Sequence, residues 1–131
     1  MKERDYNSLE KMISYCEDVA LLYNKYNRDF ELYLTDISFQ YSANMCIIQI
    51  GELVSRLSDE IMEEYNNIPW HSVKSMRNLH AHDYEKVDMK ITWQIITEDI
   101  PQFKMEIQEI LEKEMDNIEY EDEEMSSPMK M

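Results

Sequence analysis

The sequence predicts an all-α protein, an antiparallel bundle of four to five helices. Apolar residues recur at three- and four-residue steps along most of the chain, which is the period of an amphipathic helix. Only one glycine and three prolines occur among 131 residues, so few positions favour turns. No segment alternates apolar and polar residues as a half-buried strand would. This length predicts a single domain.

The first expected helix covers residues 5–26. A single apolar stripe follows it at helical spacing, and its members are Leu9, Met12, Ile13, Cys16, Val19, Ala20 and Tyr23. The stretch NRDF at residues 27–30 then predicts a break. A second helix should run from about Phe30 or Thr35 to Leu57, with its very apolar middle in the core. Its expected inward residues are Ile37, Tyr41, Met45, Ile48, Leu53 and Leu57.

Shorter helices should follow. Ser58 can cap a helix over 59–65, and the turn NNIPW at residues 66–70 leads into a third main helix near 70–80. Asp88 should cap a fourth near 89–98 that carries Ile91, Ile95 and Ile96. Pro101 fits the first turn of a fifth helix, which Thr97 or Asp99 would cap. The inner face of this last helix should hold Phe103, Ile107, Ile110 and Leu111.

The chain becomes strongly acidic towards its end. Residues 112–124 hold eight acidic residues and one lysine, and the whole chain has a net charge of −15. We therefore expect a helical bundle over 1–117 and an acidic, disordered tail over 118–131. An acidic surface repels nucleic acid at long range, which an RNA-directed function would have to overcome locally.

Composition also indicates the cellular compartment of the protein and excludes some kinds of binding site. Cys16 and Cys46 lie among apolar residues, which favours buried thiols in a reducing compartment. The charged N-terminus and the lack of a long apolar run predict a cytoplasmic protein with no membrane span. One glycine is too few for a phosphate-binding loop or a dinucleotide fingerprint.

The stretch MRNLHAHDYEKVD, residues 76–88, gathers the side chains with useful chemistry. Histidine exchanges protons near neutral pH, and arginine binds phosphate through a charged fork. Arg77 and His82 together would suit phosphodiester cleavage without a metal ion. On an intact helix their side chains would diverge by about 140°. We therefore expect the helix to end near His80 or Ala81, so that the following residues turn back towards Arg77.

Each member of this cluster also has a purely structural interpretation. Arg77 could form a salt bridge with a neighbouring acid, and His80 could be a packing or surface histidine. Tyr84 could be a core tyrosine, and Asp83 could cap the turn. The sequence HAHD also resembles a metal-binding pattern, but no further cluster of ligands accompanies it, so we predict no metal.

The residues RNLHAHDY have the form Arg-x4-His-x-Tyr, and three flanking blocks extend the pattern. These blocks are IGELVSRLSDEI (50–61), IPWHSVKSMRN (68–78) and DYEKVDMKITWQIITEDIPQF (83–103). In order and spacing they resemble the HepT-like toxins, a branch of the HEPN ribonuclease superfamily. The resemblance spans about residues 50–105.

This resemblance implies a dimer with two copies of the motif at its cleft. Arg77 and His82 would be the catalytic pair of a metal-independent RNA endonuclease that needs no cofactor. Asn78 would be a polar helper beside Arg77, and Asp83 would support the site. His80 departs from the family pattern and could assist or replace His82 in proton transfer. Tyr84 would be adenylylated by a small nucleotidyltransferase antitoxin, which would place a bulky anion in the cleft and block RNA.

Two other functions remain open from the sequence. The chain could be a non-catalytic helical module that binds a nucleotide or a protein, or an interaction protein with a methionine-rich surface, since it has 11 methionines. The binding module predicts that alanine is tolerated at both Arg77 and His82. The interaction protein predicts that His82→Ala is silent, whereas changes to apolar surface residues abolish pairing.

Overall fold

The fold is known from a computed structural model that describes residues 1–82 and 87–126. Within this part, only the backbone is described for residues 79, 81, 82 and 117–126. The described residues form helices and no strand, which confirms the all-α prediction. The elements are α1 (Glu3–Lys25), α2 (Phe30–Thr35), α3 (Ile37–Ser55), α4 (Asp59–Glu64), α5 (Trp70–His82), α6 (Met89–Gln94), the π-helical turn η2 (Ile95–Asp99) and α7 (Ile100–Ser126).

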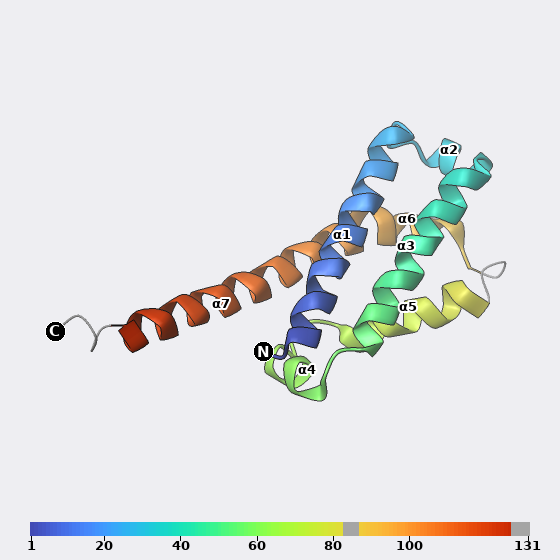
Figure 1. Ribbon diagram of the computed structural model, residues 1–131. Coiled ribbons are helices and arrows are strands. Elements are labelled where there is room, and N and C mark those ends of the chain that lie inside the picture. Colours follow the sequence, from blue (N-terminus) through green and yellow to red (C-terminus); the bar gives the residue numbers. More distant parts are fainter. Residues whose placement is uncertain (83–86, 127–131) are drawn as a thin grey trace.

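Four long helices build the bundle. α1 packs along α3, α5 crosses α3, and the first part of α7 packs on α1 (Figure 1). The far part of α7 projects away from the other helices (Figure 1). The core lies between α1, α3, α5 and α7, and its most deeply buried large side chains include Leu9, Met12, Tyr33, Phe39, Ile47, Ile50, Ile107 and Ile110.

Short polar side chains set where the helices begin. The carboxylates of Asp29, Asp36 and Asp88 accept backbone N–H groups in the first turns of α2, α3 and α6, at 2.8–2.9 Å. The hydroxyl oxygen of Ser58 accepts the backbone N–H of Ile61 in the first turn of α4 at 3.4 Å. These bonds satisfy N–H groups that have no partner within their own helix. The caps expected at Ser58 and Asp88 are thus confirmed, and the cap at Asp36 divides the expected second helix into α2 and α3.

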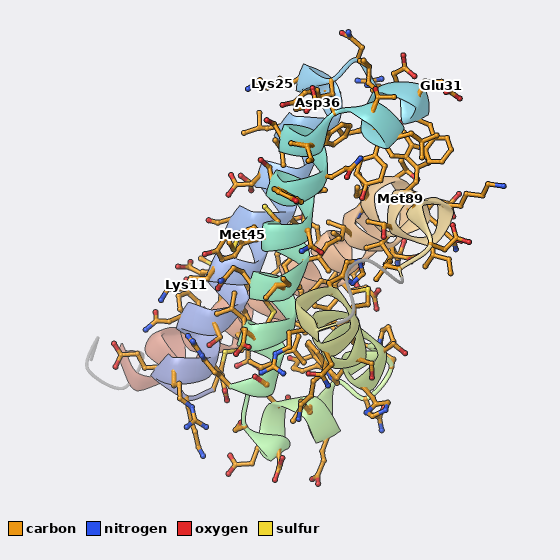
Figure 2. The ribbon with its side chains drawn as sticks, turned by 90° about the vertical axis from the view of Figure 1, so that its right-hand side faces the viewer. Lys11, Lys25, Glu31, Asp36, Met45 and Met89 are labelled. Atoms are coloured by element: carbon orange, nitrogen blue, oxygen red, sulfur yellow. The ribbon has the colours of Figure 1, made fainter. Side chains whose placement is uncertain are left out.

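The inward face predicted for α3 is partly wrong. Ile37, Tyr41 and Met45 are 60%, 58% and 56% exposed, and Met45 lies on the outer side of the helix (Figure 2). The buried side chains of this half of α3 instead include Phe39 and Ala43. Residues two apart lie about 200° apart around a helix, so the two sets occupy opposite faces. Leu53 and Leu57 are buried as expected, whereas Ala20 of α1 is exposed.

The expected break before Pro101 is absent. α6, η2 and α7 form one uninterrupted helical run, and the hydroxyl of Thr97 donates to the carbonyl of Trp93 at 2.9 Å instead of capping a helix. Proline cannot donate the backbone bond of a helix interior. The π-helical turn η2 ends at Asp99, two residues before Pro101, and changes the local backbone bonding. Ile91, expected to face inward, is 54% exposed.

The last helix is longer than the sequence suggested. α7 reaches Ser126, so residues 118–126 continue it past the boundary expected at 117, and residues 127–131 lie outside the described part. None of the helices in the described residues is both long and apolar enough to cross a membrane.

Candidate active site

The motif is presented by α5. This helix begins at Trp70, directly after Pro69, where the proline fits the entry to a helix. The indole N–H of Trp70 donates to the carbonyl of Tyr65 at 3.0 Å, and its ring meets Phe103 edge-on with centroids 6.0 Å apart. These contacts fix the start of α5 on the rest of the bundle. The N-terminal end of α5 is therefore held in place, which limits the movement of the motif residues further along the helix.

Arg77 occurs near the middle of α5 and is 30% exposed at its side chain. Its Nε–H donates to Oε1 of Glu52 on α3 at 2.6 Å, and its Nη1 donates to Oδ1 of Asn78. The salt bridge that the sequence left open for Arg77 thus exists. Asn78, expected as a polar helper, contacts Arg77 directly. Among the described residues, none accepts a hydrogen bond from Nη2.

The single glycine lies directly beneath Arg77. A Cβ atom added to Gly51 would be 2.1 Å from Cβ of Arg77 and 3.2 Å from its Cα. Real Cβ atoms do not approach so closely, so no other residue fits here unless the helices move. Gly51 therefore allows α3 and α5 to make their close approach at the position of the arginine.

His80 lies inside the bundle and is only 1% exposed. Its Nδ1 is 2.8 Å from the carbonyl oxygen of Met76, which can only accept, so Nδ1 carries the proton of the neutral ring. Nε2 then accepts from the hydroxyl of Thr92 on α6 at 3.2 Å. Burial lowers the pKa of His80, and the bond to Met76 opposes this in part. Since both nitrogens are occupied, the geometry favours the packing interpretation over a role in proton transfer.

His82 is the last residue of α5, so the helix runs slightly past the end expected at His80 or Ala81. Arg77 and His82 therefore lie on one continuous helix, five positions apart, a spacing of about 140° around its axis. The side chain of His82 is outside the described residues, as are Asp83 and Tyr84 altogether. The expected return of these side chains towards Arg77 stays a prediction.

Both acidic and basic residues lie on the helices that carry or flank the motif. Lys74, one helical turn earlier on α5, and Lys90 on α6 are exposed, whereas Lys86 lies outside the described residues. Glu52 is the acid in direct contact with Arg77. A local positive patch formed by these lysines and Arg77, which would attract RNA to an acidic chain, stays a prediction.

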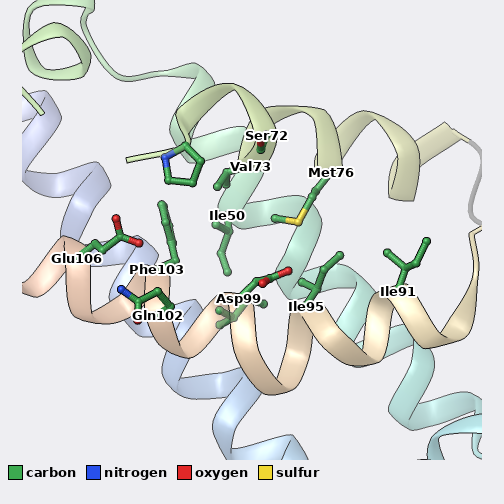
Figure 3. A pocket seen from close by; sticks show the side chains of 12 residues that line it. Ile50, Ser72, Val73, Met76, Ile91, Ile95, Asp99, Gln102, Phe103 and Glu106 are labelled. Carbon is green, nitrogen blue, oxygen red and sulfur yellow. The ribbon is translucent and has the colours of Figure 1, made fainter. Parts of the chain in front are cut away.

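An apolar groove borders the other side of α5. It has a volume of about 450 Å³ and lies between α5 and the run of α6, η2 and α7, with Ile50 of α3 behind it (Figure 3). Its lining is mainly apolar, and its polar members are Ser72, Asp99, Gln102 and Glu106. Such a lining suits an apolar side chain better than a phosphate. In the described part of the chain, no group of three histidine, cysteine or acidic residues could hold a metal ion.

The sequence did not assign a role to Glu52 or Gly51. The contact between Glu52 and Arg77 joins residues 25 positions apart on different helices, and no local pattern reports such a pair. A signal existed for Gly51: a lone glycine inside an apolar helical segment costs about 1 kcal/mol and usually has a packing reason.

Comparisons with known proteins agree on one family. A family model described as "Ribonuclease HepT-like" matches residues 8–110. A Methanocaldococcus jannaschii protein named "Putative RNase" is 30% identical over 112 residues, which cover 85% of this chain and 95% of that protein. A Thermococcus cleftensis protein named "Probable ribonuclease HepT" is 30% identical over 95 residues, which cover 69% of this chain and 86% of the relative.

A further match covers only parts of both proteins. A second Methanocaldococcus jannaschii protein, named "Gamma-glutamylcyclotransferase and putative RNase", is 41% identical over 64 residues, or 49% of this chain. The matched part spans 29% of that relative's length. No solved structure gives a significant match.

Proposed function

Because the chain belongs to the HepT-like ribonuclease family, we propose that it is the toxin of a toxin–antitoxin pair and cleaves RNA internally without a metal ion. The observation that carries the proposal is the way in which the Arg77 side chain is held and exposed. Its guanidinium is held by Glu52 and Asn78, partly exposed, on the helix that ends at His82. A fixed guanidinium with N–H donors to spare binds a phosphate in a defined orientation.

The cleavage step uses the two proposed catalytic side chains. The imidazole of His82 takes the proton of a ribose 2′-hydroxyl, and the 2′-oxygen attacks the neighbouring phosphorus. The bond from phosphorus to the 5′-oxygen breaks, and an imidazolium returns a proton to that oxygen. Arg77 stabilises the added negative charge of the pentavalent phosphate. The products are a 2′,3′-cyclic phosphate end and a 5′-hydroxyl end.

We further propose that two copies of the chain complete the site. The spacing of Arg77 and His82 supports this, because five positions along one helix are about 140° apart around its axis, and a second α5 could supply the histidine that completes a site with a given arginine. The test mixes Arg77→Ala with His82→Ala after both variants are unfolded and refolded together. Restored RNA cleavage is expected, since mixed dimers carry one intact arginine and one intact histidine. If the mixture is as inactive as each variant alone, the shared site is refuted.

Tyr84 is proposed as the point of control. An adenylyl group on its hydroxyl would add an anion and bulk two residues from His82, which opposes RNA binding by charge and by steric exclusion. Coexpression with a small nucleotidyltransferase antitoxin should add the mass of AMP to a peptide that contains Tyr84. The Tyr84→Phe variant should escape the modification, and modification at another residue would contradict this assignment.

The groove favours one alternative, a non-catalytic module that binds an apolar segment of a partner protein. Its apolar lining between α5 and α7 is the observation in favour. Replacement of the exposed groove residue Ile91 by Asp should then abolish partner binding, while His82→Ala should have no effect. The ribonuclease proposal predicts the reverse for RNA cleavage.

A further inference from the structure

We propose that Glu52 is a positioning residue for Arg77, which holds the guanidinium so that its Nη2 edge faces the phosphate of bound RNA. This inference rests on the proposed ribonuclease function and assigns part of that site to α3. Glu52 itself does not touch the substrate. It acts through the arginine, by fixing a long side chain that would otherwise sample many rotamers.

The contact has the properties of an orienting bond. The Nε–H of Arg77 meets Oε1 of Glu52 at 2.6 Å, which is short for a charge-assisted bond between nitrogen and oxygen. The two side chains are 30% and 32% exposed, so solvent screens them less than a fully exposed pair. A partner on a second helix ties the guanidinium to the bundle and not only to its own helix.

The backbones beneath the pair are fixed as well. Gly51 precedes Glu52 and lies against Cα and Cβ of Arg77, so α3 and α5 are in close contact at this point. The bases of both side chains are therefore held at a set separation. A carboxylate and a guanidinium on a rigid crossing form a preorganised pair, whose geometry does not have to be found when RNA binds.

The two bonds leave a defined set of donors. A guanidinium has five N–H groups. Glu52 uses the one on Nε, and Asn78 uses one on Nη1, so the second on Nη1 and both on Nη2 remain available within the described part of the chain. A phosphate is thereby directed to the outer end of the guanidinium. The carboxylate also repels phosphate, so Glu52 should favour orientation at a small cost in RNA affinity.

Because Glu52 both orients Arg77 and repels phosphate, its variants should differ in kcat and in KM. Glu52→Gln keeps an acceptor oxygen at the same reach and removes the negative charge. Glu52→Asp keeps the charge and withdraws the oxygen by one methylene, and Glu52→Ala removes both. An orienting role predicts that kcat stays within about threefold for Gln but falls about 10- to 100-fold for Asp and Ala. The KM for RNA should fall for Gln and Ala, because a repulsive charge is gone.

The experiment measures kcat and KM on a fluorophore-labelled single-stranded RNA oligonucleotide in EDTA, with thermal unfolding of every variant. Glu17→Gln is the matched control, because Glu17 pairs with Lys104 at 3.9 Å on α1 and α7, away from the motif. It should leave both constants unchanged. At enzyme concentrations high enough to measure the residual cleavage by Arg77→Ala, adding Glu52→Ala should change that residual rate by less than about twofold, since the residue through which Glu52 acts is absent.

The outcomes separate this inference from the function on which it rests. If the wild-type protein does not cleave RNA, the proposed function fails and the inference with it. If the wild type cleaves and Glu52→Ala has normal kcat, or lowers kcat equally without Arg77, the positioning role is refuted and the ribonuclease stands. If Glu52→Ala does not fold, the order of Gln and Asp decides, because a role of charge alone predicts that Asp is the more active.

Discussion

Replacing Gly51 by alanine should destabilise the protein, although this change usually stabilises a helix. Alanine in a helix interior is favoured over glycine by about 0.5–1 kcal/mol. Here its Cβ would be 2.1 Å from Cβ of Arg77, against the 3.4 Å at which ordinary contact begins. The two helices would have to part by about 1.3 Å at their crossing. Overpacking of this kind costs about 1–3 kcal/mol, so we expect a net loss of about 1–2 kcal/mol.

Urea unfolding followed by circular dichroism measures this loss. A second substitution identifies its cause: Arg77→Gly removes the atom that the new methyl group meets. In an Arg77→Gly background the cost of Gly51→Ala should vanish or change sign. The reasoning is refuted if Gly51→Ala stabilises the wild-type protein, or if its cost is the same with and without Arg77.

Three further predictions concern stability and reactivity. Asp5 is buried and accepts from the N–H and hydroxyl of Ser58 at 2.9 and 2.5 Å, so Asp5→Ala should cost about 3 kcal/mol in urea unfolding, and Asp5→Asn less. Burial lowers the pKa of His80, so near this pKa the unfolded chain binds more protons than the folded protein. The free energy of unfolding should therefore fall as the pH drops below about 6.5, the ordinary pKa of histidine. The His80→Gln variant should show a weaker dependence of stability on pH. Burial raises the pKa of the Cys16 and Cys46 thiols to about 12 and about 11, so a thiol reagent should label them only after unfolding.

The caps and the bundle could be predicted from the sequence because they depend on local chemistry. Ser58 and Asp88 bond to N–H groups within three residues, and such short-range patterns are visible in one chain. The face of α3 could not be predicted in this way. Ile37 and Phe39 both begin apolar series at helical spacing, on opposite sides of the helix. Contacts with other elements determine which series is buried, and the ring of Phe39 meets those of Tyr26, Tyr33 and Trp93.

The candidate site shows the same limit. The motif places Arg77 and His82 on α5, but the partner of the arginine comes from α3 and depends on how the two helices cross. The interior position of His80 likewise depends on Thr92 of α6, 12 residues away. A sequence pattern identifies the residue types of a site, whereas orientation and burial arise from contacts between elements.

The central claim is that this chain cleaves RNA through Arg77 and His82 without a metal ion. The most direct measurement incubates the purified protein with RNA in EDTA, beside the His82→Ala variant, and identifies the ends of the products. The account predicts cleavage with 2′,3′-cyclic phosphate ends by the wild type and none by the variant. Equal cleavage by both proteins, or an inert wild type whose Tyr84 carries no adenylyl group, would contradict it.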